Sequence, residues 1–129
     1  MQFSKAAEYA IIGLTHLVSA ENQSASVGQI AHAEKLSLYF LRNVFQKLRD
    51  AKLVESKRGS GYTLTKNPKN ISLKDILETV ERKLVIHACL QKKESGCARA
   101  KNCKIVYQLA KVQKRMLADL DKISLIDLI

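Results

Sequence analysis

The stretch SVGQIAHAEKLSLYFLRNVFQKLRDAKLVESKRGSGYTLT, residues 26–65, decides the fold. Its first part predicts two helices separated by a tight turn. Ser26 and Gln29 form a capping box, which begins a short helix. Ser37 caps a second helix, over 38–51, in which apolar residues recur at helical spacing on one face. Two short helices joined in this way are the elements of a helix-turn-helix.

The second part of this stretch predicts a β-hairpin. Residues 53–57 and 62–65 are two short β-like runs, and residues 58–61, which include two glycines, suit a tight turn between them. A hairpin directly after two helices is the wing of a winged helix-turn-helix. In that fold the second helix enters the major groove of DNA, and the wing touches the backbone or the minor groove.

Further helices flank this stretch. An apolar helix is expected over 4–19, and a capping box at Ser72 and Asp75 begins another helix that runs to Val80. A long helix over 103–122 has an apolar stripe made of Ile105, Leu109, Val112, Met116, Leu120 and Ile123. One small winged helix cannot cover a stripe of this length, so we expect a second copy of the chain to bury it in a homodimer.

The chain of 129 residues has the size of one domain. The predicted fold class is mostly α with a small β-hairpin: a winged helix-turn-helix domain followed by a long C-terminal dimerisation helix. We divide it into the winged helix-turn-helix over 1–80, a cysteine-bearing loop over 81–102, and the dimerisation helix with a C-terminal turn over 103–129.

The charge of the chain indicates an anionic partner. It has 22 Lys and Arg against 12 Asp and Glu, a formal net charge of +10. Residues 35–69 alone hold nine of the basic residues and two acidic ones. An excess of this kind suits nucleic acid or an acidic membrane surface, and its clustering on the winged helix favours DNA. The sequence shows neither a membrane-spanning run nor a secretion signal, so we expect a cytoplasmic protein.

The second helix and the wing supply the candidate DNA contacts. Arg42 and Asn43 suit base edges in the major groove, because Arg pairs with guanine and Asn with adenine. Arg58 at the wing tip suits the minor groove. The alternative is that these charges form only the solvated face of an amphipathic helix. The full set of candidates is Ser37, Tyr39, Arg42, Asn43, Gln46, Lys47, Arg49, Arg58 and Ser60.

Three cysteines, Cys89, Cys97 and Cys103, lie within fifteen residues, and the rest of the chain has none. Their spacing includes no Cys-x2-Cys pair of the kind that zinc knuckles use. Iron–sulfur clusters accept wider spacings on loops, and nearby basic residues stabilise an anionic cluster. Three thiolates leave one iron in need of a further ligand, for which His87 or a carboxylate is available. The alternative is that the three are buried or incidental thiols.

These residues resemble a known family, the bacterial winged-helix iron–sulfur regulators of the IscR and NsrR type. The resemblance covers almost the whole chain. It is carried by the order of its short motifs, which are Met1-Gln2-Phe3-Ser4, Glu8-Tyr9-Ala10, Gln29-Ile30-Ala31, residues 48–54, residues 58–64, residues 71–76, the three cysteines and residues 123–128.

The resemblance implies a homodimer on a palindromic double-stranded DNA operator and a cluster held by the three cysteines, with [4Fe-4S] favoured over [2Fe-2S]. The IscR-like branch has a His three residues after the last Cys, where this chain has Val106. The NsrR-like branch, which senses nitric oxide, takes its fourth ligand from an N-terminal acid of the partner subunit, and the matching residue is Glu8. The resemblance therefore favours the NsrR-like branch, with His87 as the second choice of ligand.

Two other functions compete with this one. The cysteines could form a thiol–disulfide switch without metal in the same DNA-binding protein. Alternatively, Cys97 or Cys89 could be an enzyme nucleophile with His87 as its base, but the sequence offers no group to orient that histidine. We therefore expect a transcription regulator, in the role of a repressor, and not an enzyme.

Overall fold

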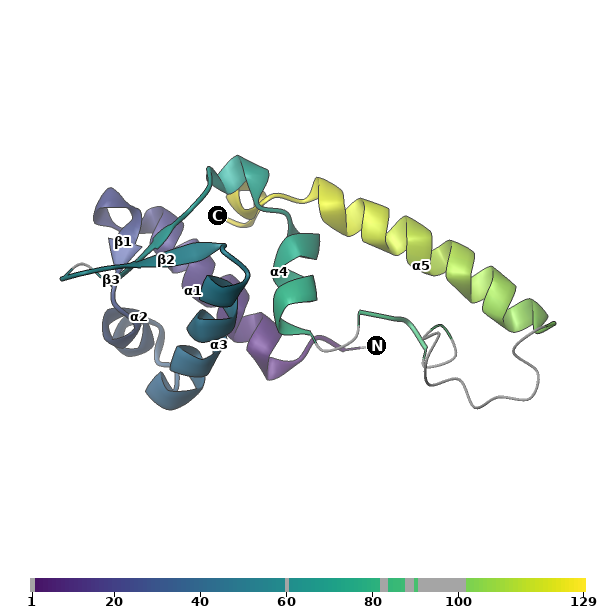
Figure 1. Cartoon of the computed structure of the whole chain (residues 1–129), viewed down its shortest axis with the longest axis horizontal. Helices are drawn as coiled ribbons and strands as arrows, with labels where there is room; N and C mark the ends of the chain where they lie inside the picture. The colour runs from purple at the N-terminus through teal and green to yellow at the C-terminus, as the bar shows by residue number, and fades with distance from the viewer. Residues whose placement is uncertain (1, 60, 82–83, 88–89, 91–101) are drawn as a thin grey trace.

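The computed structural model describes residues 2–59, 61–81, 84–87, 90 and 102–129 (Figure 1). Within these residues a bundle of short helices and a small sheet form one body, and a long helix extends away from it (Figure 1). The helices are α1 (Lys5–Ser19), α2 (Val27–Glu34), α3 (Leu38–Asp50), α4 (Leu73–Val80) and α5 (Lys104–Lys122). The strands are β1 (Ser24–Ala25), β2 (Val54–Lys57) and β3 (Gly61–Leu64).

The predicted starts of α2, α3 and α4 are each confirmed by a hydrogen bond from a backbone N–H to the capping side chain, whereas α5 begins after Cys103 without such a bond. Ser26 and Ser72 cap α2 and α4 in capping boxes, each completed by the third residue of its helix. Ser37 caps α3 by accepting from the N–H of Phe40. The turn between α2 and α3 is confirmed as well, because Lys35 adopts a left-handed conformation with φ 56°. The helix-turn-helix is therefore built from local signals that the sequence displays.

The sheet has one strand more than the predicted hairpin. Its strands are antiparallel in the order β1-β3-β2, and Ser24 pairs with Thr63. Strand β1 was not predicted from the sequence, because a two-residue strand is too short to show alternation. Gly61 adopts a φ of +79°, and a side chain there would collide with the backbone of Ala25 and Ser26. This glycine thus permits the close approach of β3 to β1.

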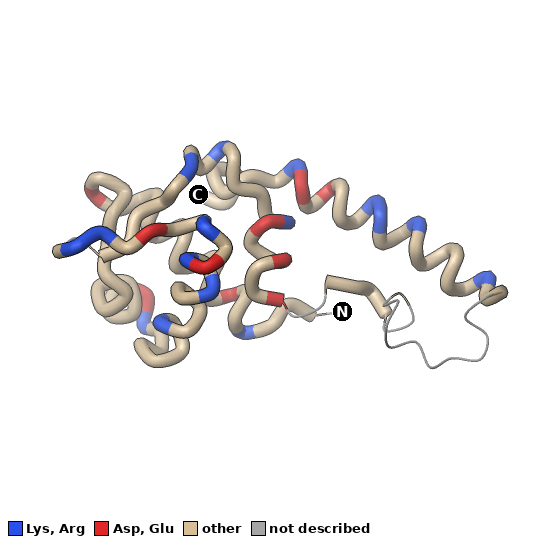
Figure 2. Tube along the Cα trace, in the orientation of Figure 1, with Lys and Arg blue, Asp and Glu red and all other residues tan. Residues whose placement is uncertain are grey.

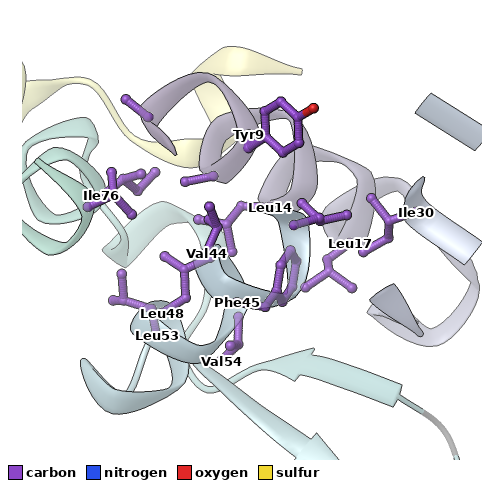
Figure 3. Close-up of a cluster of buried hydrophobic side chains, with 14 of the residues drawn as sticks. Tyr9, Leu14, Leu17, Ile30, Val44, Phe45, Leu48, Leu53, Val54 and Ile76 are labelled. Carbon is purple, nitrogen blue, oxygen red and sulfur yellow. The ribbon is translucent and has the colours of Figure 1, made fainter. Parts of the chain in front are cut away.

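The core lies between α1, α3, α4 and the sheet, with Phe45 at its centre (Figure 3). Phe45 is fully buried and packs against Tyr62 of β3, with ring centroids 5.1 Å apart. A Cβ at Gly13 of α1 would lie 2.6 Å from the Phe45 ring, so α1 and α3 pack as closely as a glycine allows. This contact fixes the angle at which α3 is presented.

The C-terminal end of the chain returns to the winged helix. The N–H of Leu125 donates to the carbonyl of Ile71 at 2.8 Å, and the Leu125 side chain is fully buried. The apolar stripe of α5 divides accordingly, since Leu120 and Ile123 pack against the core while Ile105 and Val112 are 68% and 52% exposed. No residue of α5 is fully buried. Among the described residues, no helix combines the length and the apolar character that crossing a membrane requires.

Candidate nucleic-acid interface and cysteine site

One face of α3 is buried and the other is presented to solvent. Leu41, Val44, Phe45 and Leu48 point into the core. All seven predicted DNA contacts that lie on α3 or at its cap are exposed. They are Ser37, Tyr39, Arg42, Asn43, Gln46, Lys47 and Arg49. The structure therefore brings these candidates together on one accessible helix, on which the Tyr39 side chain is 77% exposed.

The basic residues between positions 35 and 69 have no acidic partner among the described residues. All nine Lys and Arg between residues 35 and 69 are exposed. In the described part of the chain, none of the nine forms an ion pair with an acidic side chain. Figure 2 shows basic positions on α3 and along the wing. An uncompensated positive surface of this kind attracts the phosphates of a nucleic acid.

A groove of about 350 Å³ runs between α3, the first turn of α2 and the base of the wing. Arg42 and Gln46 line it from α3, and Gly28 lines it from α2. The first turn of α2 was not among the DNA contacts predicted from the sequence. The capping box at Ser26 marks where α2 begins, but its local hydrogen bond gives no sign that this turn lies beside α3, the helix predicted to enter the major groove.

The wing presents Arg58 to solvent beside Gly59, which has a φ of +82°. A glycine tolerates this conformation without strain, so the turn leaves the arginine at the tip. Ser60, the other wing candidate, lies outside the described residues.

The candidate metal ligands are only partly described. Cys89 and Cys97 lie outside the described residues, whereas Cys103 is a half-buried free thiol that precedes the first residue of α5. His87 is exposed. Within the described residues, no group of three or more potential ligands lies together. The donor set that could hold a cluster is therefore three thiols from one short segment, which is the chemistry that iron–sulfur clusters prefer.

Glu8 occupies an accessible position on α1. From Ala6 to Val18 it is the only exposed residue, because the rest of that segment is buried or half-buried. A carboxylate at this position can reach a neighbouring molecule without disturbing the core.

A helix-turn-helix followed by the two-stranded wing of β2 and β3, with an exposed basic surface on its second helix, defines a DNA-binding winged-helix protein. Residues 3–129 match the Rrf2 family, described as "Iron-dependent Transcriptional regulator". The chain belongs to this family of transcriptional regulators.

Relatives and solved structures agree with this assignment. The HTH-type transcriptional regulator IscR of Cereibacter sphaeroides is 35% identical over 86 residues, which are 63% of this chain and 56% of that protein. The match thus spans a little over half of this relative's length. The structure of CymR, the global cysteine regulator of B. subtilis, has a TM-score of 0.77 at 25% identity and covers 99% of this chain and 95% of that one. IscR of T. potens has a TM-score of 0.72 at 28% identity, over 98% and 85% of the two chains.

Proposed function

We propose that the chain is a homodimeric, cytoplasmic repressor whose affinity for a palindromic DNA operator is set by the state of its three cysteines. The observation that carries the DNA-binding part is the set of nine exposed basic residues on α3, the wing and their flanks, which have no acidic partner within the described part of the chain. A merely solvated face would intersperse charges of both signs, whereas residues 35–69 hold nine basic residues and only two acidic ones.

In this proposal the protein groove that Arg42 lines faces the edge of the major groove of DNA. Arg42 and Asn43 read base edges, and Tyr39 and Lys47 hold phosphates on either side. Arg58 enters the minor groove from the wing tip. Arg42 is supported as a base contact because it lines this groove together with the first turn of α2 and the base of the wing.

The exposed half of α5 supports the homodimer. Ile105, Tyr107 and Val112 are all more than half exposed on a helix that extends away from the winged helix (Figure 1). Large apolar side chains gathered on one protruding helix need a cover, and a second copy of the same helix provides one across a twofold axis.

Cys89, Cys97 and Cys103 are the residues that would hold an iron–sulfur cluster, with Glu8 of the partner subunit as the proposed further ligand and His87 as the second choice. When bound, a cluster would supply a group that reacts with nitric oxide and oxygen. The exposure of Glu8 supports its role, because its carboxylate is accessible to a second copy of the chain. Besides nitric oxide and oxygen, such a protein could respond to the supply of iron–sulfur clusters.

A second candidate function keeps the DNA binding and makes the cysteines a thiol–disulfide switch. The likeness to CymR, named a global cysteine regulator, favours it. Anaerobic purification followed by visible absorbance and by iron and sulfide analysis separates the two. We expect a brown protein with stoichiometric iron and sulfide. A colourless, iron-free protein that forms a disulfide on oxidation would instead establish the thiol switch.

Single substitutions then assign the ligands. Replacing any one cysteine by Ala is expected to abolish the cluster absorbance, whereas Glu8→Ala leaves a cluster that decays faster in air. Glu21→Ala, which removes another exposed acid, is the matched control and is expected to behave like the parent. An unchanged spectrum and lifetime in Glu8→Ala would move the fourth ligand to His87.

A further inference from the structure

The first turn of α1 is bonded to the residue at which the cysteine-bearing segment begins. Both the backbone N–H and the hydroxyl of Ser4 donate to the same carboxylate oxygen of Glu81, at 2.8 and 2.6 Å. Glu81 is the C-cap of α4 and the first residue of the segment that leads to the cysteines. Ser4 in turn caps α1, because its hydroxyl oxygen accepts from the N–H of Ala7. Glu81 thus holds the N-terminal end of α1 in place.

The same turn of α1 holds the start of the recognition helix. The N–H of Ser37, the N-cap of α3, donates to the Tyr9 hydroxyl at 3.1 Å. The Tyr9 ring meets Phe40 edge to face, with centroids 4.8 Å apart. The ammonium of Lys5 lies 5.6 and 5.4 Å from the centroids of these two rings. Since Tyr9 is 8% exposed, this junction is a packed contact and not a surface one.

The beginning of the cysteine-bearing segment is also tied to the long helix. The N–H of Ile86 donates to the side-chain carbonyl of Gln113 on α5 at 3.0 Å. Glu81 and Ile86 therefore connect one short stretch of chain to α1 and to α5. The chain that leads to the cysteines is therefore attached at Glu81 to α1 and at Ile86 to α5.

We infer that Glu81 and Tyr9 are positioning residues, which transmit the state of the cysteine-bearing segment to the recognition helix through the first turn of α1. The inference rests on the proposed function, since it requires that the cysteines control DNA affinity. It holds for a cluster and for a thiol switch alike, because the described contacts of Glu81 and Tyr9 involve neither a cysteine nor a candidate metal ligand. Displacement of Glu81 would release Ser4, and α1 would then move Tyr9 against Ser37 and Phe40 at the start of α3.

The test measures a ratio of DNA affinities. A DNA duplex is first selected from a random pool by the parent protein. Its dissociation constant is then measured by fluorescence anisotropy in three states: reconstituted with iron and sulfide, metal-free and reduced, and oxidised with diamide. The coupling factor is the largest ratio between two of these constants. Residues that carry coupling between two sites change it by about twofold to thirtyfold when they are removed.

We expect Glu81→Ala to bring the coupling factor toward one by an amount in this range, with little change in melting temperature or in the visible spectrum. Glu81→Gln keeps an oxygen that accepts from Ser4 and is expected to restore most of the factor. Glu78→Ala is the matched control, because it removes an exposed carboxylate of α4 whose ion-pair partner is Lys74. A purely structural role of Glu81 would lower the melting temperature and leave the ratio unchanged.

Tyr9→Phe tests the second half of the connection. The phenyl ring keeps its contact with Phe40 but loses the oxygen that accepts from Ser37, so we expect the coupling factor to fall here too. Because the two residues act in series, the coupling factor of the double variant Glu81→Ala/Tyr9→Phe is expected to be no lower than that of Glu81→Ala alone. Equal affinities of the parent in all three states would overturn the proposed function, and the inference with it. A coupling factor in Glu81→Ala equal to that of the parent would overturn the inference but leave the proposed function standing.

Discussion

Removal of the exposed apolar side chains of α5 tests the homodimer in depth. The perturbation is the double variant Ile105→Ala/Val112→Ala. Alanine is the best helix former, so α5 itself is retained. Neither side chain contributes to the core of the single chain, since they are 68% and 52% exposed. Any loss of self-association then comes from the surface between two copies.

The exposed fractions of Ile105 and Val112 give the expected loss of dimerisation free energy. The two substitutions remove three and two carbons, each of which contributes about 0.8 kcal/mol when it is fully buried. Scaled by the exposed fractions that a partner could cover, this amounts to about 2.5 kcal/mol per copy, or about 5 kcal/mol for the two copies of a twofold dimer. The dimer dissociation constant is therefore expected to rise by more than about a thousandfold.

Sedimentation velocity over a dilution series measures this constant. Lys114→Ala is the control, because nine residues beyond Ile105 at 3.6 residues per turn it lies on the opposite side of α5. The parent and the control are expected to sediment as dimers at micromolar concentration, and the double variant as a monomer. A parent that sediments as a monomer, or a double variant that dimerises like the parent, would refute the reasoning.

Three further predictions concern DNA contact, the wing and the C-terminal return. Arg42→Ala is expected to cost about 1–3 kcal/mol of operator affinity and to relax base preference at one position. Lys47→Ala is expected to weaken binding to all sequences about equally. Competition assays on variant duplexes measure both effects. Gly61→Ala is expected to lower the melting temperature and DNA affinity together, because the added methyl group collides with β1; Gly59→Ala, which meets no atom within 4 Å, shows the cost of the positive φ alone. Leu125→Ala is expected to destabilise the fold by about 2–5 kcal/mol in urea titrations, since its side chain is fully buried.

Each of these three predictions has an outcome that contradicts it. Operator affinity of Arg42→Ala equal to that of the parent would show that α3 is not the recognition helix. A Gly61→Ala protein as stable as the parent would mean that β1 and β3 are not in close contact. If Leu125→Ala unfolded at the same urea concentration as the parent, the return of the C-terminal segment to the core would be wrong.

The sequence predicted the parts of the fold that local signals specify. The serine caps of α2, α3 and α4 are each visible within four residues, and the buried face of α3 follows from helical spacing. The two-residue strand β1 gave no signal, because it owes its pairing to the close approach at Gly61. The apolar stripe of α5 was predicted as one surface, but its C-terminal end packs on its own core.

The candidate site was predictable to a similar extent. The exposed residues of α3 follow from the helix and its charge, whereas the groove beside Arg42 depends on how α2 and the wing pack against α3. The bonds of Ser4 with Glu81 and of Tyr9 with Ser37 join residues 77 and 28 positions apart. No local pattern marks such contacts, so only the structure could reveal them.

The central claim is that the three cysteines set the affinity of this winged helix for DNA. The most direct measurement is an anaerobic anisotropy titration of the selected duplex with the iron- and sulfide-reconstituted parent and with the triple variant Cys89→Ala/Cys97→Ala/Cys103→Ala, side by side. The account predicts dissociation constants that differ by at least about fivefold, the lower end of ordinary allosteric coupling. Equal dissociation constants, for two proteins that both bind the duplex, would contradict it.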